Sequence, residues 1–313
     1  MKVFVAGSTG VLGRRLVRQF REAGASVVAL ARNSERAEVA RALGAQALIA
    51  DLFDADSLAR AAEGCDVVIH AATSIPSGRS KPGDWAMNDR IRREGSRALT
   101  EAAGRIGAKQ YLFQSIVWVA RPHDASYFDE TSPVVYNPVY ASAADGEKIA
   151  LEAGARYGFR TGILRNGFFY SADSAHIRNA ARQLKARKLP IIGGGNAAWA
   201  MIHTDDAAGA FVVAAQANAA GLWHVVDDEP VQVGDLLGKL AMVVRAPRPR
   251  SVPKWLARII AGERIVEYFT TSTRTSNAYL RRELGWQPRF PGFSTGIEQI
   301  ARKWKMEGFL GLK

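Results

Sequence analysis

Three glycines near the start of the chain, Gly7, Gly10 and Gly13, recur at every third residue. They separate a short apolar run at 3–6 from residues 11–23, where apolar side chains recur at helical spacing. Glycine adopts unusual dihedral angles and lets backbone N–H groups approach phosphate oxygens, while the start of a helix adds partial positive charge. This strand, turn and helix predict a site for the pyrophosphate of a dinucleotide. The cofactor-binding residues expected in the turn are Gly7, Ser8, Thr9, Gly10, Val11 and Leu12.

The residue after the second expected strand bears on the choice between NAD(H) and NADP(H). A carboxylate there would bind the ribose 2′-hydroxyl of NAD(H), but this chain has Arg32. Its guanidinium can pair with the 2′-phosphate of NADP(H), and Arg14 beside the glycine turn could assist. The sequence therefore favours NADP(H). Asp51, after the third strand, is expected to bind the adenine amino group or, alternatively, to cap the following helix.

Strand and helix patterns alternate through the first half of the chain. Short apolar runs predict strands at 3–6, 27–30, 47–50, 67–69 and 111–113. A long helix is expected at about 88–107, before the last of them. Strands this short and apolar are buried on both faces, as in a parallel sheet covered by helices. The predicted fold class is α/β, a Rossmann-type doubly wound parallel sheet with a smaller C-terminal substrate lobe.

The second half of the chain is less regular. Residues 1–165 are expected to form mainly the dinucleotide-binding domain, with returning segments near 200–228. Residues 166–199 and 229–313 are expected to form mainly the substrate-binding lobe. The longest stretch without charge, 207–226, is alanine-rich and broken by a glycine, so it predicts a core helix followed by a strand rather than a membrane span.

Charge and composition narrow the partners. The chain has 42 basic and 30 acidic residues, a formal net charge of +12. The basic residues are scattered through helices and are not interleaved with aromatic residues as in a nucleic-acid groove. We therefore expect a small-molecule substrate, with a phosphorylated or acidic one permitted, and neither nucleic acid nor membrane as partner. The sequence is compatible with a homodimer.

Other patterns exclude several kinds of site. A single cysteine, Cys65, allows no internal disulfide and fits a buried position in a cytoplasmic protein, and no signal peptide is expected. The histidines have no metal-ligand spacing, so no metal site is expected. Asp205 and Asp206 lie near the start of an expected helix, where capping accounts for them better than catalysis does.

With these motifs the chain resembles the extended short-chain dehydrogenase/reductase family, the NAD-dependent epimerase/dehydratase group. The resemblance extends over nearly the whole length. It rests on residues 5–13, Asp51-Leu52, His70-Ala71-Ala72, Leu164-Arg165-Asn166-Gly167, 202–208 and 284–288. The resemblance implies these further cofactor-binding residues: Asp51, Leu52, Ala71, Ala72, Thr73, Tyr140, Asn166, Gly167 and Phe168. Phe168 and Tyr170, which follow the segment expected beside the nicotinamide, are also candidates for ligand contact.

The family's chemistry depends on a serine, a tyrosine and a lysine four residues after the tyrosine. The resemblance implies that Tyr140 is the acid/base, but the position four residues later is Ala144. Lys148 comes two helical turns after Tyr140, about 12 Å along the axis, which is too far to replace the missing amine directly. The chain is therefore an atypical member by this pattern.

The serine position is altered as well. The most natural register places Ile116 where the family has its serine, whereas Ser115, one residue earlier, points to the opposite face of the strand. A register shift or bulge would bring Ser115 inward, so it stays a catalytic candidate. A third departure is Arg92, where the family usually has an asparagine.

Two functions fit these observations. The leading hypothesis is an NADP-dependent oxidoreductase or epimerase/dehydratase-like enzyme that acts on a carbonyl or hydroxyl of a small molecule. Tyr140 would then be the acid/base, with Ser115 or a water orienting the substrate oxygen. The alternative is a redox-inactive NADP-binding sensor or scaffold, which Ala144, Ile116 and Arg92 favour. The sequence does not identify the substrate.

Overall fold

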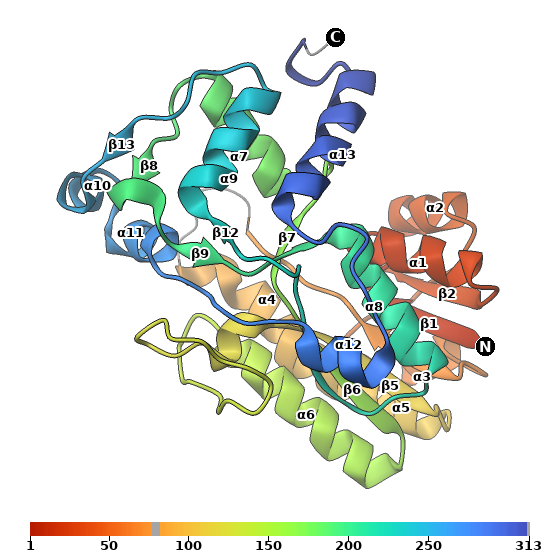
Figure 1. The fold of residues 1–313 in the computed structure, drawn as a ribbon. Coiled ribbons are helices and arrows are strands. Elements are labelled where there is room, and N and C mark those ends of the chain that lie inside the picture. The colour runs from red at the N-terminus through yellow and green to blue at the C-terminus, as the bar shows by residue number, and fades with distance from the viewer. Residues whose placement is uncertain (77–81, 312–313) are drawn as a thin grey trace.

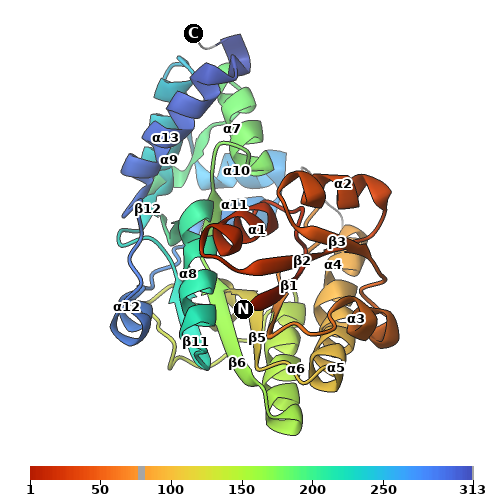
Figure 2. The ribbon, with the colours of Figure 1, turned by 90° about the vertical axis from the view of Figure 1, so that its right-hand side faces the viewer.

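The computed structural model describes residues 1–76 and 82–311. A parallel sheet with helices on both faces forms the larger part, and a smaller lobe of helices and short strands lies beyond one edge of it (Figures 1 and 2). The N-terminus lies in the sheet and the C-terminus at the far end of the smaller lobe (Figure 1). The predicted α/β fold, a Rossmann-type doubly wound sheet with a smaller lobe, is confirmed.

Seven strands form the central sheet in the order β11-β6-β5-β4-β1-β2-β3, and every neighbouring pair is parallel. The strands are β1 (Lys2–Ala6), β2 (Ser26–Ala31), β3 (Gln46–Ile49), β4 (Val67–His70), β5 (Gln110–Ile116), β6 (Arg160–Asn166) and β11 (Gly221–Val225). The chain proceeds outward from β1 in one direction and from β4 in the other. The crevice at the carboxyl ends of β1 and β4 is therefore the topological switch point at which open α/β sheets bind ligands.

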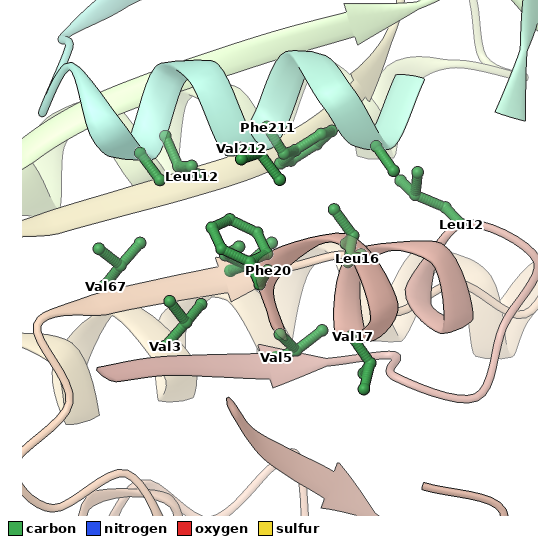
Figure 3. Packing of buried hydrophobic residues seen from close by; sticks show 14 of the residues in the cluster. Val3, Val5, Leu12, Leu16, Val17, Phe20, Val67, Leu112, Phe211 and Val212 are labelled. Carbon is green, nitrogen blue, oxygen red and sulfur yellow. The ribbon is translucent and has the colours of Figure 1, made fainter. Parts of the chain in front are cut away.

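Two layers of helices bury the sheet. The first contains α1 (Gly13–Glu22), α2 (Ser34–Ala42) and α8 (Thr204–Gln216), and the second contains α3 (Ala55–Ala61), α5 (Ser96–Arg105) and α6 (Ala141–Tyr157). In the first layer, Phe20 of α1 and Phe211 of α8 pack against Val3, Val5 and Leu112 (Figure 3). Alternate residues of each strand supply the core on the other face, so the short strands are apolar throughout, as expected.

The long helix expected at 88–107 is interrupted. After a short 3-10 helix, η1 (Pro82–Trp85), it consists of α4 (Ala86–Arg90), a π-helical turn, η2 (Ile91–Gly95), and α5. The expected long helix is thus present over most of its range, but its π-helical turn was not predicted, because such a turn has no distinctive composition. Such turns are frequent at functional sites. This one carries Arg92, which is buried.

The smaller lobe has its own core. Helices α7 (Ala175–Lys185), α9 (Val233–Val243) and α13 (Phe293–Met306) enclose it, with Tyr170 and Trp304 among its largest buried side chains. Its short strands are β7 (Phe168–Tyr170), β8 (Ile191–Ile192), β9 (Ala198–Trp199), β10 (Met201–His203), β12 (Val231–Gln232) and β13 (Ser251–Val252). Helices α10 (Lys254–Ala261), α11 (Glu263–Thr270) and α12 (Ala278–Leu284) and short turns η3 (Val117–Ala120), η4 (Gly193–Gly195) and η5 (Phe309–Gly311) complete the elements.

The uncharged stretch 207–226 forms most of α8 followed by β11, as expected from the sequence. Within the described ranges, none of the helices combines the length and the apolar character needed to span a bilayer.

Candidate functional site

The glycine turn closes tightly between β1 and α1. Gly7 follows β1 with φ of 88°, and a Cβ on it would lie 2.5 Å from the backbone of Ala71. A Cβ on Gly13 would lie 1.9 Å from the carbonyl oxygen of Gly7. The N–H of Gly10 donates to that same oxygen at 3.0 Å. Glycine is thus sterically required at two of the three positions, as expected for a turn whose backbone approaches a phosphate.

In the rest of the turn, some residues anchor the turn to the sheet and others lie at the surface. The buried Ser8 hydroxyl donates to the carbonyl oxygen of Leu30 in β2 at 3.0 Å, which fixes the turn to the sheet. Leu12 is buried in the core, whereas Thr9 and Val11 are half-buried and Gly10 is exposed. The backbone of 9–11 therefore lies at the surface of the switch-point crevice, at the N-terminal end of α1.

The two arginines expected near a 2′-phosphate differ in their surroundings. Arg32 directly follows β2 and is exposed. Next to it, Asn33 caps α2 by accepting from the N–H of Arg36 at 3.0 Å. Arg14, in contrast, forms an ion pair with Asp173 at 2.8 Å. Of the two, Arg32 is the exposed residue at the carboxyl end of β2, while Arg14 binds the smaller lobe through Asp173.

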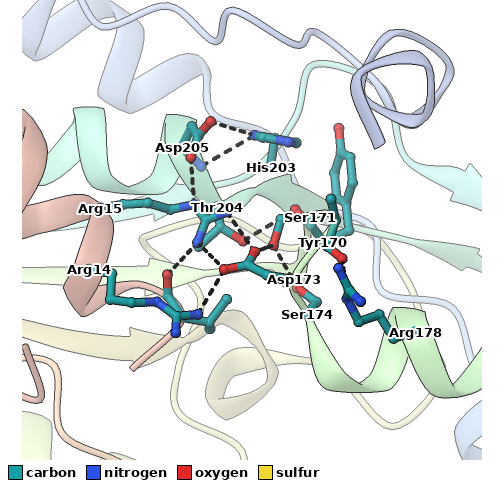
Figure 4. A network of polar contacts seen from close by, with 12 residues as sticks. Arg14, Arg15, Tyr170, Ser171, Asp173, Ser174, Arg178, His203, Thr204 and Asp205 are labelled. Carbon is teal, nitrogen blue, oxygen red and sulfur yellow. Dashed lines mark hydrogen bonds and ion pairs between the residues drawn. The ribbon is translucent and has the colours of Figure 1, made fainter. Parts of the chain in front are cut away.

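Asp173 holds α1 to the smaller lobe, and Asp205 holds α1 to α8 (Figure 4). The buried Arg15 binds Asp173 at 2.7 Å and Asp205 at 2.5 Å. Burial alone would raise the pKa of the Asp173 carboxyl, but the hydrogen bonds and charges of Arg15 and Arg14 hold it well below its ordinary value. This network also includes Arg14, through its ion pair with Asp173.

The expected capping role of Asp205 and Asp206 was wrong. Both lie inside the first turn of α8, and the side chain of His203 caps that helix by accepting from the N–H of Asp205. Asp206 instead accepts from the backbone N–H groups of Arg289 and Phe290 at 3.0 and 2.9 Å. These partners are distant in sequence, so the local pattern could not reveal them.

The loops after β3 and β4 carry the other expected nucleotide contacts. The exposed carboxylate of Asp51 accepts from the N–H of Phe53 at 3.0 Å, whereas Asp54 caps α3. The helix-cap alternative for Asp51 was therefore wrong, and the adenine contact of Asp51 and Leu52 stays a prediction. After β4, Ala71 is buried, Ala72 half-buried and Thr73 exposed, directly beside the glycine turn.

At the carboxyl end of β5, Ser115 is fully buried. Its hydroxyl donates to Oε1 of Glu147 in α6 at 2.5 Å. Glu147 also receives two hydrogen bonds from Arg165 of β6, at 2.9 and 2.7 Å. Strands β5 and β6 pair in continuous register, with Ser115 opposite Arg165 and the half-buried Ile116 opposite Asn166. Neither a bulge nor a shift turns Ser115 toward the crevice.

Tyr140 stands at the N-terminal end of α6. It is half-buried, with its ring centroid 6.4 Å from that of Trp118. Ala144, four residues on, is also half-buried. Lys148 points away from the crevice, because its side chain is 76% exposed and lies 3.8 Å from Glu152. Lys148 therefore offers no amine to Tyr140.

A cavity of about 200 Å³ opens beside Tyr140. Its lining residues are Trp118, Arg121, Pro122, His123, Val135, Asn137, Tyr140, Glu267 and Thr271. It lies between the segments that follow β5, the start of α6, and α11 of the smaller lobe. Burial raises the pKa of the Tyr140 hydroxyl, and the charge of Arg121 counteracts this only in part. Tyr140 is therefore a protonated hydroxyl at neutral pH, able to donate a proton or a hydrogen bond.

Phe168 and Tyr170, both expected to reach a ligand, have different places. Phe168 is half-buried, and its ring contacts those of Trp118 and Trp199 with centroids 6.4 and 5.3 Å apart. It thus connects the cavity to the end of β6. Tyr170 is fully buried and donates to Asp227 at 2.8 Å, so its expected ligand contact was wrong.

Several buried polar atoms at the carboxyl ends of β4, β5 and β6 have no partner within the described part of the chain. They are His70 Nδ1, Asn88 Nδ2, Arg92 Nε, Ser142 Oγ and Asn166 Oδ1. Native proteins leave few such atoms unsatisfied, and a polar ligand in the crevice would supply partners. Together with the glycine turn, this set fits a nicotinamide nucleotide. From the sequence, Arg92 stood out only as a departure from a family pattern, and its place in the site was not predicted.

Comparison with known proteins agrees with this geometry. A model of the NAD dependent epimerase/dehydratase family matches residues 3–226. A curated protein of a Streptomyces species, 3-diazoavenalumate denitrifying reductase, is 34% identical over 305 residues, which cover 95% of this chain and 99% of that protein.

Solved structures resemble the fold along its length. DesIV from Streptomyces venezuelae, a dTDP-glucose 4,6-dehydratase with NAD and TYD bound, has a TM-score of 0.79 at 22% identity, covering 98% of both chains. The human epimerase family protein SDR39U1 with NADPH has a TM-score of 0.79 at 19% identity, covering 96% of this chain and 99% of that chain. At these identities the two structures support the fold.

Proposed function

Because the chain belongs to the NAD-dependent epimerase/dehydratase family, we propose that it is an NADP(H)-dependent oxidoreductase acting on a carbonyl or hydroxyl of a small molecule. The observation that carries the proposal is the pairing of two features at one edge of the sheet. A sterically exacting glycine turn adjoins β1 and β4, and a cavity with a protonated, half-buried Tyr140 adjoins β5 and β6.

The residues present would hold the cofactor along the carboxyl ends of the strands. The backbone of Gly7 to Leu12 would receive the pyrophosphate, Arg32 the 2′-phosphate, and Asp51 with Leu52 the adenine. Residues 71–73 and 166–168 would flank the ribose and nicotinamide. A bound nicotinamide supplies or accepts the hydride in such chemistry. The solved neighbours named with NAD and with NADPH support a nicotinamide cofactor, and the exposed Arg32 supports NADP(H).

Tyr140 is the proposed acid/base. In the direction of reduction its hydroxyl donates a proton to the substrate oxygen as that oxygen gains negative charge. Its raised pKa keeps the proton in place at neutral pH and so favours this direction. The Ser115 hydroxyl is already bonded to Glu147, so we assign it to positioning α6. Water, the other group considered from the sequence, is then the group that orients the substrate oxygen.

The substrate we propose is a small acidic molecule with an unsaturated or aromatic portion. In the cavity wall, Arg121 can pair with a carboxylate or phosphate, and the indole of Trp118 offers a flat surface for a ring. The Streptomyces relative supports reductive chemistry, since its name describes a reductase. The net charge of +12 would attract such an anion.

The test compares binding with turnover. NADPH affinity is measured by its fluorescence, and NADPH oxidation is followed against aldehydes, ketones and unsaturated acids, with Tyr140→Phe as the variant. We expect about 10²-fold slower turnover in Tyr140→Phe with unchanged NADPH affinity. Tyr136→Phe, on a ring that is 78% exposed, is the matched control and should leave both unchanged. Equal turnover in Tyr140→Phe would contradict the assignment.

The pH profile provides a second readout of the same assignment. Because burial raises the pKa of Tyr140, the hydroxyl stays protonated across the neutral range. Reduction should therefore show no loss from Tyr140 ionisation across the neutral range. A decline centred below the ordinary tyrosine pKa of about 10, absent from Tyr140→Phe, would contradict a raised pKa.

A second candidate function is a redox-inactive NADP-binding sensor or scaffold. The observation that favours it is the diversion of catalytic groups: Ser115 is bonded to Glu147, position 144 is alanine, and Lys148 faces solvent. NADPH binding without Tyr140-dependent turnover on any substrate class would support this candidate over the enzyme. Absence of dinucleotide binding would exclude both.

A further inference from the structure

Arg92 is a buried arginine. It is 4% exposed at the π-helical turn η2, and its Nε has no hydrogen-bond partner within residues 1–76 and 82–311. The charges of two carboxylates act on it, Asp89 of α4 more strongly and Glu147 more weakly, and neither forms an ion pair with it within the described residues. Glu147 is already bound on both oxygens by Arg165 and on Oε1 by Ser115. Burial lowers the pKa of Arg92 to about 10, which still leaves the guanidinium charged at neutral pH.

A buried, unpaired charge destabilises the protein that holds it. Arginine elsewhere in this chain is compensated when buried: Arg15 binds two aspartates and Arg165 binds Glu147. The exception at Arg92 therefore suggests that its partner is a ligand.

The position of Arg92 indicates which ligand. The turn η2 packs against α6, where a Cβ on Gly146 would lie 3.0 Å from the carbonyl oxygen of Arg92. The preceding turn of α6 carries the buried Ala143 and the half-buried Ala144. On the other side, the charge of Arg92 acts on His70, the last residue of β4. Arg92 thus lies between the end of β4 and the first turns of α6.

We propose that Arg92 binds the nicotinamide half of the cofactor, through the ribose hydroxyls and the adjoining phosphate of that half. This inference rests on the proposed function. Arg92 would supply from η2 the cation that α6 lacks at Ala144. A guanidinium suits this task, because its fixed fork of donors can reach hydroxyl and phosphate oxygens together. Arg92 lies in the π-helical turn itself, a feature that is frequent at functional sites.

Three variants test the proposal in the full-length protein. Arg92→Met keeps the length of the side chain and removes its charge, and Arg92→Lys keeps a charge. Arg93→Met removes the neighbouring arginine, which is paired with Asp145 at the surface and serves as the control. The readouts are the NADPH and NADP⁺ dissociation constants from calorimetry and the melting temperature with and without cofactor.

We expect Arg92→Met to weaken NADPH binding at least about tenfold, Arg92→Lys to stay within about threefold, and Arg93→Met to match the wild type. Without cofactor, Arg92→Met should melt at the wild-type temperature or up to about 5 °C higher, because an uncompensated buried charge is gone. If Arg92 instead stabilised the fold, Arg92→Met without cofactor would melt at a lower temperature than the wild type.

The proposal is overturned if Arg92→Met binds NADPH within twofold of the wild type, or if its weaker binding comes with a melting temperature lowered by more than about 5 °C. If Arg92→Met does not fold, Arg92→Gln takes its place under the same criteria. A wild-type protein that binds no dinucleotide refutes the proposed function itself, whereas normal wild-type binding that is insensitive to Arg92 refutes only this inference.

Discussion

The carboxyl edge of the central sheet has two sides built from different kinds of groups. Beside β1 and β4, the surface offered to a ligand is backbone, held by Gly7 and Gly13 at positions where a Cβ would overlap the neighbouring chain. Beside β5 and β6, the polar groups are side chains, and most of them bind one another: Ser115, Glu147 and Arg165 form one buried cluster.

This difference separates two requirements of a dinucleotide enzyme. Phosphate recognition needs only amide groups in a fixed turn, so a short stretch of chain is sufficient. Proton transfer needs side chains whose donors and acceptors face the substrate. A single hydrogen bond within the protein can turn such a side chain away from it. The first side keeps the exacting turn that the proposed phosphate site requires, while on the second side Tyr140 lines the cavity.

The largest effect is expected from Gly13→Ala. The added methyl would lie 1.9 Å from the carbonyl oxygen of Gly7, so the turn must open and its amides leave the phosphate. We expect NADPH binding to weaken by more than about 100-fold, measured by calorimetry. Gly238→Ala in α9, where a Cβ would meet nothing nearer than 4.0 Å, is the control and should leave binding unchanged. Binding by Gly13→Ala within threefold of the wild type would show that the turn is not the phosphate site.

The next largest effect is expected on the opposite side, from Glu147→Ala. Removing this carboxylate leaves Arg165 buried without its partner and takes the acceptor from Ser115. Breaking a buried ion pair costs about 3–5 kcal/mol of unfolding free energy, measured by denaturant titration. Glu152→Ala, on an exposed face of the same helix, should cost less than about 0.5 kcal/mol. Equal losses of unfolding free energy in Glu147→Ala and Glu152→Ala would show that the buried cluster does not stabilise the fold.

The same division explains which features the sequence could predict. The glycine turn, the parallel strands and the α8–β11 unit depend on residues adjacent in the chain, so their patterns were sufficient. The possible assistance of Arg14 at the 2′-phosphate stays a prediction, whereas its ion pair with an aspartate 159 positions away could not be predicted from the sequence. The partners of Ser115, Asp205 and Tyr170 are likewise distant in sequence, so no local sequence pattern predicts these contacts.

The π-helical turn at Ile91–Gly95 shows a second limit. Apolar residues at helical spacing on both sides predicted one regular helix, and the inserted turn changes only the direction of the side chains within it. The sequence therefore marked Arg92 as unusual without indicating that it is buried beside α6.

Arg32 tests the comparison from the other direction, because its proposed contact with the cofactor depends on a side chain rather than on the backbone. It is exposed, so a contact with the 2′-phosphate would be screened by solvent. Arg32→Ala should weaken NADPH binding about tenfold and leave NADH binding within about twofold, and added salt should narrow the difference. Arg36→Ala, one turn into α2, is the control. An equal loss for NADPH and NADH would refute a role for Arg32 in selecting the 2′-phosphate.

The smallest effect is expected from Ser115→Ala, and it distinguishes a positioning serine from a catalytic one. The hydroxyl is fully buried and donates to Glu147, which keeps both hydrogen bonds from Arg165 when the serine is removed. We therefore expect a loss of about 1 kcal/mol in unfolding free energy and turnover within about threefold of the wild type. A serine that orients the substrate oxygen would instead lower turnover by an amount comparable to Tyr140→Phe. Ser96→Ala, which removes a buried hydroxyl with no partner within the described residues, should cost less stability, because no hydrogen bond is lost.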